Sequence, residues 1–289
     1  MANDRGDLTV TALYTAETWR WGGFAEAELL ASKRGRDIFN ATNLAMGAAR
    51  LLRPRLPSLP HSLVLRHAMI DHLVARSGCR QVLELAAGLS RRGAAMSGDP
   101  GLRYIEVDLP AVIAEKERLL RRSEHGADVA DRPNLQRVAG DVRKVDLASL
   151  VDDGPLCVIA EGLLMYLPAD DQNALWRRLA ALLDGRPNSA LVFDLVPFCE
   201  QPKPGAVGRS LGWLFGRFTR GGSFAFDERT RADLSSDLRA CGFAEVEIYD
   251  PAEVAELDVP AAGHPTQALV WLTRTAASPA GTSTDSPGT

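Results

Sequence analysis

The chain has 289 residues, 46% of them apolar, and a formal net charge of −4. This length can bury one large α/β core, alone or with a smaller cap. The acidic balance and the lack of a long basic run argue against nucleic acid as a partner. The four cysteines stand far apart in the sequence, which predicts reduced thiols and no structural metal.

The N-terminal stretch MANDRGDLTV lacks the basic and apolar regions of a signal peptide. No apolar run reaches the roughly 18 residues that a membrane span needs. These features predict a cytoplasmic protein with no membrane partner.

Residues 1–76 are expected to form an N-terminal helical cap region. Pro54, Pro57 and Pro60, in RPRLPSLPHS, should break any helix there. The following segment, SLVLRHAMIDHLVARSG, has apolar residues near a 3.6 period and Gly78 as its stop. This periodicity predicts a helix that leads into the core.

Residues 77–275 hold seven short apolar runs separated by helical segments, which predicts a doubly wound, mostly parallel seven-stranded α/β sheet. The runs VLELA, CVIAE and ALVFDL are apolar on both faces, as central strands covered by helices should be. The last two runs, FAEVEIYD and QALVWLTR, are joined by a short proline-broken segment, so an antiparallel strand is expected at one end of the sheet.

Two segments should stand apart from this core. Residues 197–226 include the apolar stretch GRSLGWLFGRFTRGGS, which either covers a binding pocket as a lid or simply packs on the core. Residues 276–289 have almost nothing to bury and should be disordered.

Candidate ligand-binding residues lie at the carboxyl ends of the strands, where open α/β sheets bind ligands. The first run ends at Gly88, which lets a ligand approach the backbone closely. Its loop, GLSRRG, is not a hydrolase nucleophile elbow, because Arg92 replaces the second glycine. Asp108 ends the second run, twenty residues after Gly88, where a nucleotide-binding fold places its ribose carboxylate. Asp108 could instead cap the helix that starts at Pro110.

The third and fourth runs end in further polar residues. Asp141 could accept a hydrogen bond from an adenine amino group, or could be an ordinary turn aspartate. Glu161 suits a cationic ammonium, but could equally be a solvated strand end. Tyr166 is the candidate catalytic residue, through a contact with an acceptor oxygen.

Four segments together resemble the leucine carboxyl methyltransferase family, which includes polyketide O-methyltransferases of the tetracenomycin type. They are QVLELAAGLSRRG, YIEVDLPAVIAEKERLL, RVAGDVRKVDL and IAEGLLMYLPADD. The spaced EVDLP...K and EGLLMYLP segments are distinctive for that family, whereas the glycine loop is not. The loop departs from the family at Ala86, which is usually glycine, and at Ser90, where an aspartate normally precedes the arginine pair.

The resemblance implies a class I methyltransferase fold with S-adenosyl-L-methionine as cofactor. Gly88 would lie beside its methionyl part and Asp108 on its ribose. Glu161 would face the methionyl end, and Arg66 would pair with its carboxylate; taken alone, Arg66 is only a solvated arginine on an amphipathic helix. The cofactor-binding residues implied are Arg66, Glu84, Gly88, Asp108, Asp141, Val142 and Glu161.

The leading hypothesis is therefore O-methylation of a small molecule in secondary metabolism. The expected acceptor is a carboxylate on an apolar or aromatic body, because the strand ends offer no histidine as a base for a phenol. One alternative is a nicotinamide-dependent oxidoreductase, although the loop lacks the G-x-G-x-x-G spacing. The other is a methyltransferase-like binding protein without catalysis.

Overall fold

The computed structural model describes residues 10–201, 228–254, 256–257 and 265–276. Most of the lid-like stretch proposed at 197–226 lies outside the described residues. So does the tail at 276–289, apart from its first residue.

A single seven-stranded sheet forms the centre of the molecule, with the strand order β3-β2-β1-β4-β5-β7-β6. Its strands are β1 (Gln81–Leu85), β2 (Arg103–Asp108), β3 (Leu135–Ala139), β4 (Cys157–Ala160), β5 (Ala190–Asp194), β6 (Glu245–Tyr249) and β7 (Val270–Arg274). The first five strands pair in parallel. Strand β7 is antiparallel to both of its neighbours, β5 and β6. The mostly parallel sheet with an antiparallel strand near one end confirms the fold predicted from the seven apolar runs.

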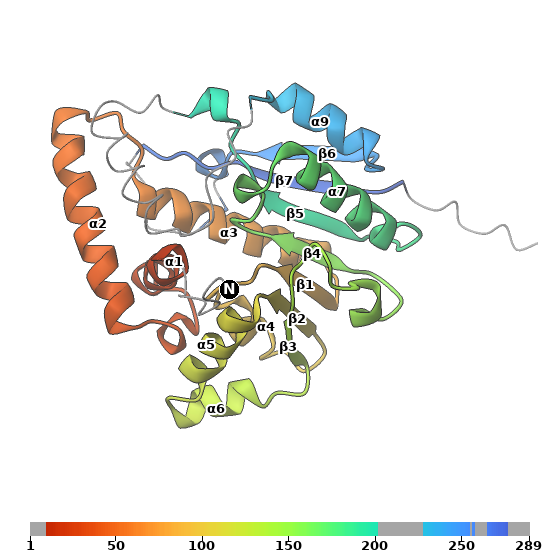
Figure 1. Ribbon diagram of the computed structural model, residues 1–289, viewed down its shortest axis with the longest axis horizontal. Helices are drawn as coiled ribbons and strands as arrows, with labels where there is room; N and C mark the ends of the chain where they lie inside the picture. The colour runs from red at the N-terminus through yellow and green to blue at the C-terminus, as the bar shows by residue number, and fades with distance from the viewer. Residues whose placement is uncertain (1–9, 202–227, 255, 258–264, 277–289) are drawn as a thin grey trace, which may run out of the picture.

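Helices cover both faces of this sheet (Figure 1). One face packs on α1 (Val10–Trp21), α3 (Leu59–Ser77), α4 (Arg92–Met96), α5 (Pro110–Leu120) and α6 (Glu124–Ala130). The other packs on α7 (Ala169–Leu183) and α9 (Arg231–Ala240). Helix α2 (Lys33–Leu52) lies outermost, against α1. Single turns of 3-10 helix complete the described chain: η1 (Ala27–Leu29), η2 (Ala148–Leu150), η3 (Leu164–Tyr166), η4 (Phe198–Glu200) and η5 (Pro251–Glu253).

The burial of each strand follows its place in the sheet. Every residue of β1, β4 and β5 is buried, as the apolar character of both their faces predicts. The two edge strands, β3 and β6, contain both exposed and partly buried residues. The central strands are therefore the most enclosed part of the sheet.

The proline-rich stretch separates two cap helices, but one of its prolines acts differently from the prediction. Helix α2 ends before Pro54, and α3 already begins at Leu59. Pro60 thus lies in the first turn of α3, where no intrahelical partner exists for its missing amide hydrogen. Pro60 starts this helix and does not break it.

A close approach of α4 to β2 holds the short helix on the sheet. Glu106 of β2 and Lys116 of α5 form a buried ion pair, with 2.7 Å between Nζ and Oε1. Gly93 of α4 lies directly over this pair, since a Cβ atom there would be 2.2 Å from the Glu106 Oε1 atom. The same Cβ would be 2.9 Å from a methyl group of Leu135. Only glycine leaves room for both neighbours.

Replacement of Gly93 by alanine should therefore destabilise the protein, by about 1–3 kcal/mol or more, since overpacking would also disturb a buried ion pair. Urea unfolding measures the loss. Gly47→Ala is the matched control, because that helical glycine has nothing within 4 Å of its added Cβ. It should gain up to about 1 kcal/mol from helix propensity. Equal effects of the two substitutions would contradict this account of α4 packing.

Candidate functional site

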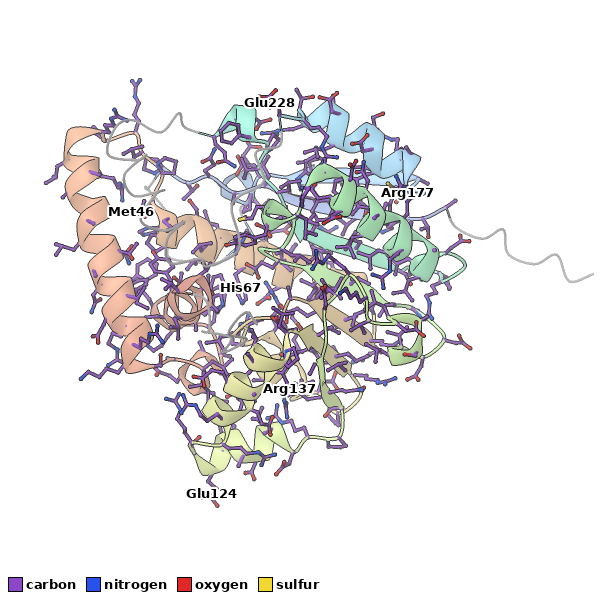
Figure 2. All side chains as sticks on the ribbon, viewed as in Figure 1. Met46, His67, Glu124, Arg137, Arg177 and Glu228 are labelled. Carbon is purple, nitrogen blue, oxygen red and sulfur yellow. The ribbon has the colours of Figure 1, made fainter. Side chains whose placement is uncertain are left out.

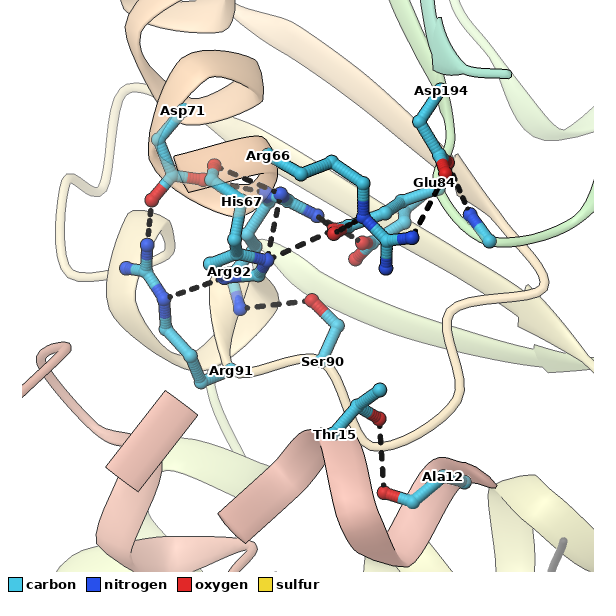
Figure 3. A network of polar contacts seen from close by, with 12 residues as sticks. Ala12, Thr15, Arg66, His67, Asp71, Glu84, Ser90, Arg91, Arg92 and Asp194 are labelled. Atoms are coloured by element: carbon cyan, nitrogen blue, oxygen red, sulfur yellow. Dashed lines mark hydrogen bonds and ion pairs between the residues drawn. The ribbon is translucent and has the colours of Figure 1, made fainter. Parts of the chain in front are cut away.

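Charged side chains converge at the carboxyl edge of β1, β4 and β5, and most of them are buried (Figure 3). They come from α3, from β1, from the loop that leads into α4, and from the ends of β4 and β5. The cluster consists of Arg66, His67, Asp71, Glu84, Arg91, Arg92, Glu161 and Asp194. We call this set the charged cluster.

Arg92 is the centre of the charged cluster and has no exposed surface. Its guanidinium lies 2.5 Å from an oxygen of Asp71, 2.9 Å from Glu84 and 2.6 Å from Glu161. Burial opposes the charge on Arg92, but the carboxylates of Glu161 and Glu84 outweigh it and raise the pKa of the guanidinium. Arg92 therefore remains a cation and ties α3, β1 and β4 together.

Arg66 is buried between two carboxylates, so its reading as a solvated helix residue is wrong. Its Nε donates to Glu161 and its Nη1 to Asp194, each over 2.8 Å. The other terminal nitrogen, Nη2, makes no hydrogen bond within the described part of the chain, and it lies 3.7 Å from the position of a Cβ on Gly162. Two carboxylates thus hold Arg66 while one edge of its guanidinium stays available.

Glu161 is a paired carboxylate, and the alternative of a solvated strand end is also wrong. One oxygen accepts from Arg66, and the other lies 2.9 Å from His67 Nδ1 and 2.6 Å from Arg92. Burial alone would raise the pKa of Glu161, but Arg92, His67 and Arg66 together hold it well below its ordinary value. Glu161 is therefore ionised throughout the neutral range.

His67 lies in the interior of the molecule and has no exposed surface (Figure 2). Its ring stacks on Trp19 of α1, with 3.9 Å between centroids, and meets Phe24 edge-on. Burial, and then the charge of Arg92, lower the pKa of His67 well below 6.5, although Glu161 acts in the opposite direction. His67 is therefore neutral at physiological pH.

The glycine loop and Asp108 meet as their spacing predicts. The amide of Gly88 donates to Asp108 Oδ2 over 2.6 Å, and the amide of Leu109 donates to Oδ1 over 2.6 Å. Asp108 makes no side-chain cap to α5, whose N-cap is Leu109, so the capping alternative is not supported. Burial raises the pKa of Asp108, against the two amide hydrogen bonds.

The backbone of the loop explains why glycine is usual at position 86. Ala86 has φ 51° and Gly88 has φ 52°, both in the left-handed region. A residue with a Cβ pays roughly 1 kcal/mol for this conformation. The loop therefore keeps the left-handed conformation that glycine favours at position 86, and it tolerates Ala86 at some cost in stability.

The remaining predicted residues differ in their surroundings. Both oxygens of Glu84 meet protein donors, Arg92 and the Tyr104 hydroxyl, so its visible role is to neutralise Arg92. Asp141 makes a turn with the Arg143 amide, and hydrogen bonds from the Arg143 side chain lower its pKa. Val142 is buried in the core next to it. Tyr166 ends η3 and is partly buried.

Sequence reasoning missed five members of the charged cluster: His67, Asp71, Arg91, Arg92 and Asp194. One signal could have found the first two. The stretch LVLRHAMID places Arg66, His67 and Asp71 among apolar residues of a helix that is buried on most sides. Charged residues among the apolar residues of a buried helix need buried partners of opposite charge. The stretch therefore predicts a cluster of charged side chains between this helix and the sheet.

A hollow of about 250 Å³ opens between α1, α2 and the start of α3. Its walls are mainly apolar and include Trp21, Phe39 and Met46. His61 lines it too, with its Nδ1 atom 2.6 Å from the hydroxyl of Ser58. The hollow lies on the cap side of α3, the helix that also carries Arg66 and His67.

The described residues contain no group of three or more His, Cys, Asp or Glu side chains that could hold a metal ion. Within the same ranges, no helix combines the length and apolar character that crossing a bilayer requires.

Comparisons with known proteins point to one family. The model of the family described as leucine carboxyl methyltransferase matches residues 25–180. A predicted S-adenosyl-L-methionine-dependent methyltransferase of Mycobacterium avium (strain 104) is 39% identical over 130 residues, 43% of this chain and 41% of that protein. Another, from Mycobacterium ulcerans (strain Agy99), is 35% identical over 149 residues, 48% of this chain and 47% of that protein. The matched part thus spans less than half the length of these relatives.

Among solved structures, magnesium protoporphyrin IX methyltransferase from Synechocystis PCC 6803, with bound S-adenosylhomocysteine, has a TM-score of 0.46 and 18% identity. The similarity covers 83% of this chain and 98% of that one.

The neutral state of His67 predicts a specific pH dependence of stability. Below about pH 6.5 the imidazole binds a proton in the unfolded chain but not in the folded one, so the wild type loses stability as the pH falls. His67→Asn lacks this titration. Between pH 6.5 and 5 the stability difference between the two proteins should shrink by at most about 1.4 kcal/mol per pH unit. Urea unfolding at several pH values measures it, and parallel curves would contradict a neutral buried His67.

Proposed function

Because the chain belongs to the leucine carboxyl methyltransferase family, we propose that it is an S-adenosyl-L-methionine-dependent O-methyltransferase acting on a small molecule. The family and the class I fold predicted from the sequence are confirmed. The predicted cofactor is the one for which the relatives are named. The observation that carries the proposal is the available edge of Arg66 at the carboxyl ends of the strands, the edge of the sheet at which the Gly88–Asp108 pair also lies.

The charged cluster fits the amino-acid end of this cofactor. Arg66 Nη2 would donate to the methionyl carboxylate, a charge-assisted contact. The cluster has four acidic side chains, Asp71, Glu84, Glu161 and Asp194, against three arginines, and His67 is neutral. The additional acid favours a ligand end that carries an ammonium and a sulfonium.

The adenosine end would lie along the Gly88 loop and Asp108. Gly88 presents no side chain, so a ligand can approach its backbone, and Asp108 offers carboxylate oxygens to ribose hydroxyls. Asp141 and Val142 follow β3, the next strand along this edge, and are proposed to contact adenine.

When bound, the cofactor supplies an electrophilic methyl group. Transfer to an oxygen is an in-line displacement, so the residues of this chain contribute mainly alignment and the exclusion of water. His67 is not available as a base for the acceptor, since both of its ring nitrogens contact members of the charged cluster. Tyr166 is proposed to contact the acceptor oxygen.

The proposed acceptor is a carboxylate on an apolar or aromatic body. Such an acid has a pKa near 4 and is already a nucleophile at neutral pH, so it needs no base. The hollow lined by Trp21, Phe39 and Met46 has walls that suit an apolar body. The stretch LGWLFGRF, predicted to cover the acceptor, lies outside the described residues.

A hydroxyl acceptor is the second candidate, and His61 favours it. A histidine that lines the hollow could accept the proton of a phenol or an alcohol, with Ser58 orienting its ring. The two acceptors give different products, an ester and an ether.

Cofactor binding is tested with S-adenosylhomocysteine and NADH. S-adenosylhomocysteine should raise the melting temperature of the protein and NADH should not, since a ligand at a hundred times its Kd adds about 2.7 kcal/mol to the free energy of unfolding.

Asp108→Ala should weaken the binding of S-adenosylhomocysteine at least about tenfold, because hydrogen bonds to charged groups contribute roughly 1.5–3 kcal/mol each. Asp131→Ala, at a surface ion pair with Arg121, is the matched control and should bind like the wild type. Stabilisation by NADH alone would overturn the proposed cofactor.

The product distinguishes the two acceptors. A carboxylate acceptor should give a methyl ester, which mild alkali cleaves to methanol, and a single-turnover rate nearly flat from pH 6 to 8. An alkali-stable methyl ether, whose formation is lost in His61→Phe, would identify a hydroxyl acceptor instead. Cofactor binding without turnover on a panel of both acceptor types would favour a binding protein.

A further inference from the structure

We propose that His67 is a positioning residue of this site. As the Nδ1–H tautomer it holds Glu161, and through Glu161 it keeps Arg66 aimed at the amino-acid end of the cofactor. This inference rests on the proposed function, since it names a residue that makes the Arg66 contact possible without touching the cofactor.

The contacts of the ring assign the tautomer. Nε2 lies 3.1 Å from Arg91 Nε, which can only donate, so this contact favours an unprotonated Nε2. Nδ1 then carries the hydrogen and donates to Glu161 Oε2 over 2.9 Å. Arg92 Nη2 lies 2.9 Å from Nδ1 and favours the opposite tautomer, but it also has the backbone oxygen of His67 as an acceptor at 3.2 Å. The opposite tautomer would fail at two contacts, with N–H against N–H at Arg91 and a lone pair against the carboxylate of Glu161, whereas the Nδ1–H tautomer fails only at Arg92.

The surroundings of the ring prevent it from turning. Trp19 stacks on one face and Phe24 meets it edge-on. Arg91 is fixed in turn, by an ion pair with Asp71 and by its position 4.9 Å over the Phe24 ring. The labelled side chains in Figure 3 show Arg91 and Arg92 pointing toward His67 from the α4 side. The donor at Nδ1 therefore has one direction, toward Glu161.

Glu161 transmits this constraint to Arg66. Its second oxygen accepts from Arg66 Nε over 2.8 Å, so a rotation of the carboxylate would release that nitrogen. Asp194 would then hold the guanidinium at Nη1 alone. A guanidinium held at one nitrogen can pivot, and Nη2 would no longer be directed toward the cofactor carboxylate.

Three variants separate this role from a structural one. His67→Asn places an amide donor near the position of the imidazole Nδ1 atom. His67→Gln places its amide near the position of Nε2, and His67→Ala has no polar group at either position. S-adenosylhomocysteine and 5′-methylthioadenosine are the probes, titrated by calorimetry into folded protein. The second probe has the adenosine but no amino-acid end, so it reports on folding and on the adenosine site alone. His125→Asn, at a surface ion pair with Glu26, is the matched control.

For His67→Gln and His67→Ala we expect affinity for S-adenosylhomocysteine to fall at least about tenfold, the loss of roughly one charge-assisted hydrogen bond. His67→Asn should restore most of it, and affinity for 5′-methylthioadenosine should stay within about threefold in all variants. Equal losses for both probes, or Asn no better than Gln, would overturn the positioning role while leaving the methyltransferase proposal intact. A wild type that binds neither probe would overturn the proposed function itself.

Discussion

The site depends on one constraint, which is that Arg92 cannot be buried without carboxylates around it. An isolated guanidinium in the interior would cost several kcal/mol, and removing one partner of a buried pair typically costs 3–5 kcal/mol. Arg92 obtains its partners from three separate elements: Asp71 of α3, Glu84 of β1 and Glu161 after β4. The need to neutralise one cation thus fixes the positions of those elements relative to each other, and Arg66 and His67 are placed as a consequence.

The same constraint explains the pattern of acids on one face of the sheet. Glu84 and Glu106 are direct neighbours in the register of β1 and β2, and their like charges would repel. Each carboxylate pairs with a different cation, Glu84 with Arg92 and Glu106 with Lys116. Gly93 follows Arg92 and has no side chain, so the backbone of α4 can lie close to Glu106 of β2. Lys116 is the lysine of the EVDLP...K segment, so its spacing reflects a buried ion pair.

Features that depend on residues close together in the sequence could be predicted, whereas contacts between residues far apart in the sequence could not. The strands and most helices follow from local periodicity, and the Gly88–Asp108 pair follows from spacing along neighbouring strands. The antiparallel β7 could be predicted because its connection to β6 is too short for a crossover helix. Asp194 could not be predicted, since its partner Arg66 stands 128 positions away and no local pattern links them. The apolar stretch around Arg66 could have indicated its burial, but it does not identify the partners Glu161 and Asp194.

The arginines of the loop obtain a carboxylate from a helix outside the loop. Ser90 stands where the family normally has an aspartate, so the loop lacks the acid that would face its own arginines. Ser90 only accepts from the Arg92 amide, over 3.2 Å, and brings no charge. Asp71 pairs with both Arg91 and Arg92, so α3 supplies a carboxylate to this loop. Since α3 also carries Arg66 and His67, the ion pairs of Asp71 link the loop to that helix, and under the proposed function cofactor binding should depend on the cap helices as much as on the sheet.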